Sequence, residues 1–176
     1  MLDVAVAYNR YRFLGNEFLT WLWYLVENQP ERFQRFLDEP ATVEIGNRMV
    51  LENRLNENVE TITIKGDDAD LEEALLALRK GALVTELNLV FRIGEHQWQF
   101  NLKGESINIS GLKTPETAAA ETPEDMEGWV LEKIYLYEKA VSLVENTFSE
   151  FARLRTATDW AQKWHPLLVR WIAGKP

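Results

Sequence analysis

The sequence contains no cysteine and only two histidines among its 176 residues. The absence of cysteine excludes disulfides, thiolate metal sites and cysteine nucleophiles, and it is typical of a protein in a reducing cytoplasm. No apolar run reaches the roughly 18 residues that a membrane span requires, and the N-terminus, which carries Asp3, lacks the basic region of a signal peptide. We therefore expect a cytoplasmic protein that does not engage a membrane.

Basic residues are scarce as well, since 19 Lys and Arg against 28 Asp and Glu give a formal net charge of −9. This balance argues against non-specific nucleic-acid binding over the whole surface, because a phosphate footprint needs clustered cations. A local basic face stays compatible with it. Hydrophobic residues make up 46% of the chain and recur regularly, which predicts a globular domain and excludes disorder for most of the chain.

Signatures of catalytic and cofactor sites are also missing. The sequence has no G-x-S-x-G, no G-x-G-x-x-G and no Walker-type phosphate loop. His96 and His165 have no partner at metal-ligand spacing. Paired acids such as Glu72 and Glu73 lie where a helix is predicted to start, and the helix dipole explains them there. We expect no catalytic residue, no metal and no cofactor, and we predict that the chain is not an enzyme.

The hydrophobic pattern predicts an α+β fold. Helices are predicted over 17–28, with Asn16 as N-cap, over 31–38, and from Asp68 or Asp70 to about Lys80. Gly46-Asn47 predicts a two-residue hairpin turn between two strands. Alternation over 83–93 and 97–103 predicts an antiparallel hairpin, with further strands at 59–65 and 106–110. We expect an antiparallel sheet of five or six strands, covered on one face by helices.

A long C-terminal helix is predicted from about 127 to 155, because apolar residues recur there in a strict heptad pattern from Val130 to Phe151. A second apolar stripe on it holds Leu136, Leu143 and Leu154. Pro166 is expected to interrupt the last helix. The predicted organisation is a single domain: a helix pair plus sheet over 1–112, an acidic flexible linker over 113–127, and C-terminal helices packed on the sheet over 128–176.

Aromatic and heptad residues are the candidates for an interface. Tryptophans in general are expected in the core, but Trp21 and Trp23 could not both face one core from a single helix, which favours an interface for them. The heptad positions expected at the same kind of contact are Ile134, Tyr137, Val141, Val144 and Phe148.

Two groups of basic residues could contact phosphates. Arg10 and Arg12 lie among tyrosines near the N-terminus. The C-terminal stretch 152–176 has a local balance of +4 and contains Arg153, Arg155, Lys163 and Arg170. The alternative interpretation is that these side chains are solvated and balance a helix C-terminus.

Three stretches resemble a known family. They are Glu17-Phe18-Leu19-Thr20-Trp21, Asp70-Leu71-Glu72-Glu73, and the run from Lys80-Gly81-Ala82-Leu83 through Val84-Thr85-Glu86-Leu87-Asn88-Leu89. Together with the order of the elements over residues 14–155, they resemble the C-terminal part of the recombination-associated protein RdgC, in its divergent, tryptophan-rich form.

The resemblance implies a DNA-associated, non-enzymatic protein. Members of the family form ring-shaped dimers around duplex DNA, bind it without sequence preference and restrain recombinase filaments. Arg79 and Lys80 fall in the best-matching stretch and become candidates for phosphate contact. The partners implied are duplex DNA, at the nucleoid, and either a second copy of the chain or a separate chain that supplies the family's N-terminal half. The alternative hypothesis is a protein–protein assembly module with the same fold and no DNA binding.

Overall fold

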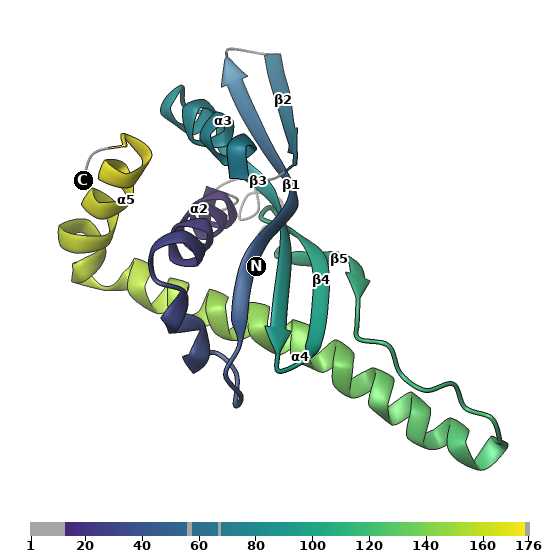
Figure 1. Cartoon of the computed structure of the whole chain (residues 1–176). Coiled ribbons are helices and arrows are strands. Elements are labelled where there is room, and N and C mark those ends of the chain that lie inside the picture. The colour runs from purple at the N-terminus through teal and green to yellow at the C-terminus, as the bar shows by residue number, and fades with distance from the viewer. Residues whose placement is uncertain (1–12, 56–57, 67, 175–176) are drawn as a thin grey trace, which may run out of the picture.

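The computed structural model describes residues 13–55, 58–66 and 68–174. Five strands form one antiparallel sheet in the order β2-β1-β3-β4-β5 (Figure 1). The strands are β1 (Thr42–Leu55), β2 (Asn58–Lys65), β3 (Leu83–Ile93), β4 (His96–Lys103) and β5 (Asn108–Lys113). The helices are α2 (Phe13–Asn28), the 3₁₀ helix η1 (Pro30–Arg35), α3 (Asp68–Arg79), α4 (Pro123–Thr156), the π-helix η2 (Trp160–Trp164) and α5 (His165–Ile172).

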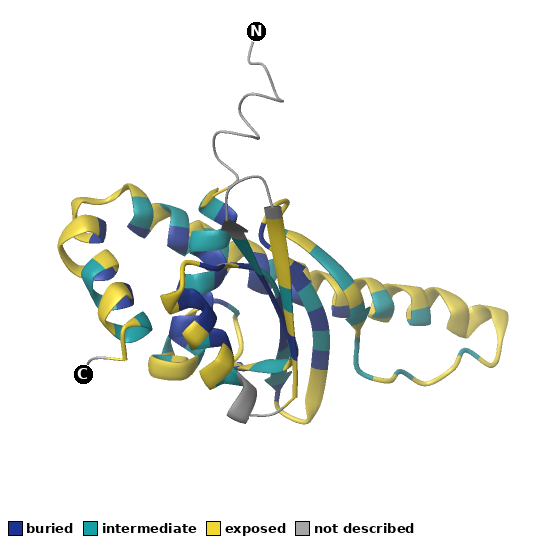
Figure 2. Cartoon of the chain, turned by 90° about the horizontal axis from the view of Figure 1, so that it is seen from above, coloured by how far each residue is buried: buried dark blue, intermediate teal, exposed yellow. Residues whose placement is uncertain are grey.

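The helices cover one face of the sheet, which confirms the predicted α+β class. Alternating residues of β3 and β4 point to the helices and are buried, among them Leu89, Phe91 and Phe100. On the other face, the Asn88 amide donates a hydrogen bond to Oδ1 of Asn101 at 2.7 Å. Figure 2 shows the buried residues concentrated in α2 and in the strands that it faces. The core therefore lies between the sheet and the helical layer.

The predicted hairpin at Gly46-Asn47 is wrong, because β1 continues through both residues as one strand. The pairing of β1 with β3 shifts register between Ile45 and Met49, so this stretch is a bulge rather than a turn. A Cβ on Gly46 would lie 2.0 Å from Oδ1 of Asn88. The glycine is thus required by the close approach of a neighbouring side chain, which no local turn signal reveals.

The start of α2 also differs from the prediction. Asn16 does not cap the helix but lies inside its first turns, and its amide donates a hydrogen bond to the Val84 carbonyl at 2.7 Å. Gly15 precedes it and contacts the backbone of Gly104, such that a Cβ there would lie 1.8 Å from the Gly104 oxygen. The Gly-Asn pair therefore fixes the helix against the sheet instead of starting it.

The C-terminal helices agree with the prediction in type and differ in their bounds. α4 begins at Pro123, inside the predicted linker, where Thr122 and Asp125 form a capping box. The chain between β5 and Pro123 has no regular structure. Pro166 lies in the first turn of α5, directly after the π-helix η2. This position is the one expected of a proline that interrupts a helix.

The contact between Gly15 and Gly104 gives a first prediction. Gly15→Ala should lower the free energy of unfolding by about 1–3 kcal/mol, because the added methyl group collides with backbone that cannot move aside. Gly128→Ala is the matched control, since Gly128 lies in α4 with open space around it, and this change should raise stability by up to about 1 kcal/mol. Urea unfolding measures both, and a Gly15→Ala protein as stable as the parent would contradict the packing.

Candidate interaction surfaces

The N-terminal half of α4 exposes a continuous apolar surface. The first turns of α4 project beyond the sheet (Figure 1), while the rest of the helix packs on the domain. Of the twelve large hydrophobic residues that are exposed within the described chain, seven lie on α4 between Met126 and Val141. Five of them follow one helix face and are here named the α4 stripe: Met126, Val130, Ile134, Tyr137 and Val141.

The orientation of α4 explains why the stripe is uncovered. The helix packs on the sheet through Leu136, Ala140 and Leu143, and the Trp98 indole donates to the Leu136 carbonyl at 2.9 Å. At 100° per residue, these residues lie about a third of a turn away from the stripe. The second apolar stripe predicted from the sequence therefore makes the contact with the domain, and the heptad positions as far as Val141 are exposed to solvent.

The later heptad positions do not belong to this surface. Val144 is buried, and the Phe148 ring packs edge-on against Phe18 of α2 at 5.1 Å. Ile134, Tyr137 and Val141 stay exposed. The expectation of an interface for Val144 and Phe148 is thus corrected, because Val144 belongs to the buried core and the partly buried Phe148 packs against it.

Trp21 and Trp23 also lie inside the chain, so the expectation that they anchor an interface is corrected. Both have no exposed surface. The Trp21 ring contacts Phe151 at 5.6 Å, and the Trp23 ring packs edge-on against Trp171 at 5.1 Å. Two helix faces are buried because the sheet covers α2 on one side and the C-terminal helices cover it on the other.

Glu27 joins the ends of α2 and α5. Its carboxylate accepts hydrogen bonds from the indole of Trp23 at 2.5 Å and from that of Trp171 at 3.1 Å. Partial burial raises the pKa of Glu27 above its ordinary value, and the two indole donors oppose that rise. Trp23 lies one turn before Glu27 in α2, whereas Trp171 lies on α5, 144 residues further along the chain. That the two indoles meet at this carboxylate could therefore not be predicted from the sequence.

The predicted phosphate-contact residues within the described chain lie on several elements. Arg155 forms an ion pair with Glu17 at 2.6 Å, and the Arg79 guanidinium donates to the Ile172 carbonyl at the end of α5. Lys80, Lys163 and Arg170 are exposed on separate elements. Arg10 and Arg12 lie outside the described residues.

Arg153 lies in a group that the sequence did not predict, here named the arginine cluster: Arg32, Arg35 and Arg153. It lines one hollow with Asn146, Ser149 and Glu150. The hydrogen bonds from Arg153, followed by the charges of Arg32 and Arg35, lower the pKa of Glu150. Three guanidinium groups around a single carboxylate leave a local charge of +2 on a chain whose net charge is −9.

The described residues contain no group of three or more His, Cys, Asp or Glu side chains that could hold a metal ion. His96 and His165 are both exposed, at the start of β4 and at the start of α5. Among the helices of this part of the chain, none has the length and apolarity needed to cross a membrane. Comparisons with models of protein families, with curated proteins and with solved structures found no match to this chain.

The raised pKa of Glu27 predicts a pH dependence. A carboxylate whose pKa is higher in the folded than in the unfolded chain stabilises the fold most below its ordinary pKa of 4.5, and that contribution is lost as the pH rises through the folded value. Glu27→Gln removes this titration. The stability of the variant relative to the parent should therefore rise as the pH increases from about 4 to 7, as measured by urea unfolding. A difference that stays constant with pH would contradict the assignment.

Proposed function

We propose that the chain is a non-enzymatic assembly module that pairs with a second copy of itself through the α4 stripe. The observation that carries the proposal is the row of five exposed large apolar side chains along one face of α4. A contiguous apolar face of this kind is stabilised by burial against another protein surface. Its heptad spacing fits a second helix, and closed two-fold dimers are the commonest oligomers.

Charges beside the stripe favour a parallel arrangement. From Val130 on, the stripe residues fill heptad positions a and d, which places Lys133 at g and Glu138 at e. In a parallel pair, position g of one helix faces position e of the other, five residues further along. Lys133 then lies opposite Glu138 of the partner subunit, and the symmetry repeats this ion pair. In an antiparallel pair, position g of one helix would face position g of the other, and both ion pairs would be lost.

The proposal predicts that Ile134→Asp combined with Val141→Asp dissociates the dimer. Burying unpaired carboxylates in a helix seam should raise the dissociation constant by roughly 100-fold or more. Leu76→Asp is the matched control, because Leu76 on α3 is 46% exposed and Ile134 is 48% exposed. Sedimentation velocity over a range of concentrations measures the mass. A parent protein that is monomeric throughout, or a double variant of unchanged mass, would overturn the proposal.

A charge exchange tests the direction of the helices. Lys133→Glu alone should weaken the dimer, because it places two carboxylates opposite each other in the parallel pair. Adding Glu138→Lys should restore the parental dissociation constant, because the ion pairs re-form with reversed polarity. If the double variant has a dissociation constant as high as that of the single variant, the parallel arrangement is excluded. Self-association through the α4 stripe would still stand.

A second candidate function is the sequence-independent association with duplex DNA that the resemblance to RdgC implies. The observation that favours it is the arginine cluster. Arg35 has no hydrogen-bond or ion-pair partner among the described residues, and the Arg32 guanidinium lies 4.9 Å over the Trp164 ring. Guanidinium groups held without full neutralisation are suited to phosphate oxygens. The contact would fix the protein on the backbone without reading bases.

This candidate predicts salt-sensitive binding of a fluorescent duplex. Affinity measured by anisotropy should fall steeply between about 50 and 200 mM salt. Arg32→Gln with Arg35→Gln should reduce the slope of log affinity against log salt by about 2, equally for unrelated duplex sequences. Lys65→Gln with Lys113→Gln changes the net charge by the same amount on β2 and β5 and should leave the slope nearly unchanged. If the protein does not bind the duplex at the lower salt concentration, the chain alone is not a DNA-binding protein.

A further inference from the structure

The N-terminal part of β1 is a free sheet edge. β2 pairs with β1 only from Arg48 to Leu55, whereas β3 pairs with it from Thr42 onwards. Within the described residues, no strand lies beside Thr42–Asn47 on the side away from β3. At the end of this edge, the Asn47 carbonyl already accepts a hydrogen bond from the Gly66 N–H at 3.2 Å. The free edge is therefore residues 42–46, about 16 Å long at 3.3 Å per residue. It offers room for one further short strand.

The peptide groups at this edge are directed outward. The Gly104 N–H donates to the Thr85 carbonyl across the β3–β4 pair. Because peptide groups alternate in direction along a strand, the even-numbered residues of β3 face β1, opposite Thr42 and Glu44. The N–H and C=O groups of Val43 and Ile45 therefore turn to the free edge. An extended peptide would satisfy them with backbone hydrogen bonds.

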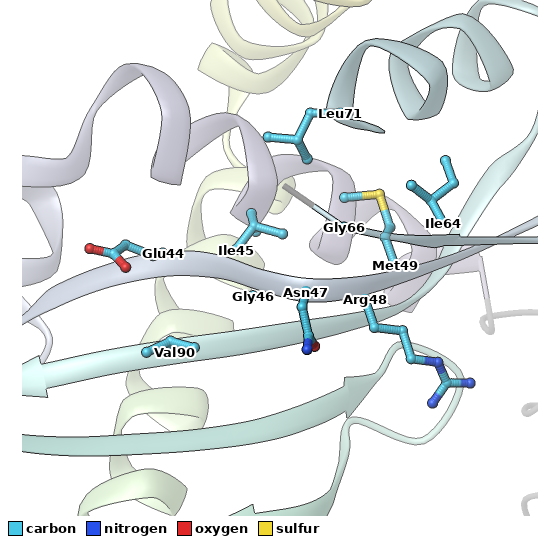
Figure 3. A pocket seen from close by; sticks show the side chains of 10 residues that line it. All are labelled: Glu44, Ile45, Gly46, Asn47, Arg48, Met49, Ile64, Gly66, Leu71 and Val90. Carbon is cyan, nitrogen blue, oxygen red and sulfur yellow. The ribbon is translucent and has the colours of Figure 1, made fainter. Parts of the chain in front are cut away.

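An apolar groove runs along the helical side of this edge. It consists of two adjoining hollows of about 460 and 650 Å³ that share Glu44, Ile45 and Leu71. Figure 3 shows Leu71 of α3 facing Ile45 and Met49 across the first hollow. The side chains of one face of an added strand would enter this groove, whereas its backbone would follow the edge.

The groove is acidic. Glu27, Glu31 and Glu44 line it. Glu44 is paired with Arg92 at 2.7 Å, and the one cation among the residues that line the two hollows, Arg48, is paired with Glu86 at 2.9 Å. The uncompensated negative charge is therefore that of Glu27 and Glu31. Glu31 has no ion-pair partner in the described part of the chain. A segment that enters the groove would therefore gain from basic side chains, and an acidic segment would be repelled.

We infer that the free edge of β1 binds an extended, basic segment of a partner protein by strand addition. The segment would carry apolar side chains at alternate positions, because successive residues of a strand point to opposite faces and only one face meets the groove. A basic residue at one end would lie near Glu31, and one at the other end would share Glu44 with Arg92. This surface is separate from the α4 stripe, so the inference does not depend on self-association.

The test uses the full chain and a labelled synthetic peptide, Arg-Val-Thr-Val-Thr-Val-Arg, with a second peptide in which Glu replaces both Arg. Anisotropy should show binding of the basic peptide and at least tenfold weaker binding of the acidic one. Hydrogen exchange should show protection of the Val43 and Ile45 amides only with the basic peptide. Equal binding of the two peptides, or binding without this protection, would overturn the inference.

Variants locate the site. Ile45→Pro removes an outward N–H without touching the ladder to β3 and should abolish binding. If that variant does not fold, Glu31→Lys with Glu44→Lys provides the same test, because it reverses the charge of the groove. This double variant should bind the basic peptide at least tenfold more weakly than the parent does. Glu60→Lys with Glu95→Lys makes the same change outside the groove and should leave binding unaltered.

Self-pairing of two edges is the competing outcome. Two results together would show that a second copy of the chain occupies the edge. The first is a dimer that Ile45→Pro dissociates and that Ile134→Asp with Val141→Asp leaves intact. The second is a parent protein that does not bind the basic peptide, and the inference would then be wrong. Peptide binding that persists in the Ile134→Asp, Val141→Asp protein supports it independently of the α4 stripe.

Discussion

The burial of α2 between the sheet and the C-terminal helices is the constraint on which the other arrangements depend. Its tryptophans and phenylalanines occupy both of its sides, and their ring contacts with Phe151, Trp164 and Trp171 join the first described helix to the last. Because α2 fills this space, α4 packs on the sheet only where α2 ends. Burial of large aromatic side chains is among the strongest stabilising contributions in a core.

This division of space also explains why α4 has two different halves. The helix has 34 residues and is about 50 Å long, which exceeds the width of a five-stranded sheet at about 5 Å per strand. The part that extends beyond the domain would be expected to be polar if it served only as a support. It is apolar on one face instead, and that mismatch between position and composition is the basis of the proposed assembly.

The sequence predicted the features that local periodicity determines. The β3–β4 hairpin follows from the alternation of apolar and polar residues on either side of Gly94, and α4 follows from its heptad pattern. The bulge at Gly46 could not be predicted, because it depends on Asn88 of a neighbouring strand. The α4 stripe was predicted in part: the pattern identified Ile134, Tyr137 and Val141, but only the packing of α2 decides where the exposed surface ends.

The remaining parts of the candidate surfaces depend on tertiary contacts. Arg32 and Arg35 are separated from Arg153 by more than 100 residues of chain. A count of charges along the sequence therefore assigns the three arginines to two separate regions and does not reveal that they lie together. The free edge of β1 likewise exists only because β2 is shorter than its neighbour. A strand pattern in a sequence does not state how much of the strand its partner covers.

The contacts between the ends of the described chain have a consequence for biosynthesis. Trp164 and Trp171 cover Trp21 and Trp23 of α2, from which they are separated by more than 140 residues of chain. During translation, which proceeds at about 5–20 residues per second, α2 is therefore synthesised well before the side chains that cover it. Until those residues are added, the nascent protein carries an aromatic helix whose C-terminal cover is missing. Incomplete chains that end before Trp160 are natural substrates for chaperones and proteases.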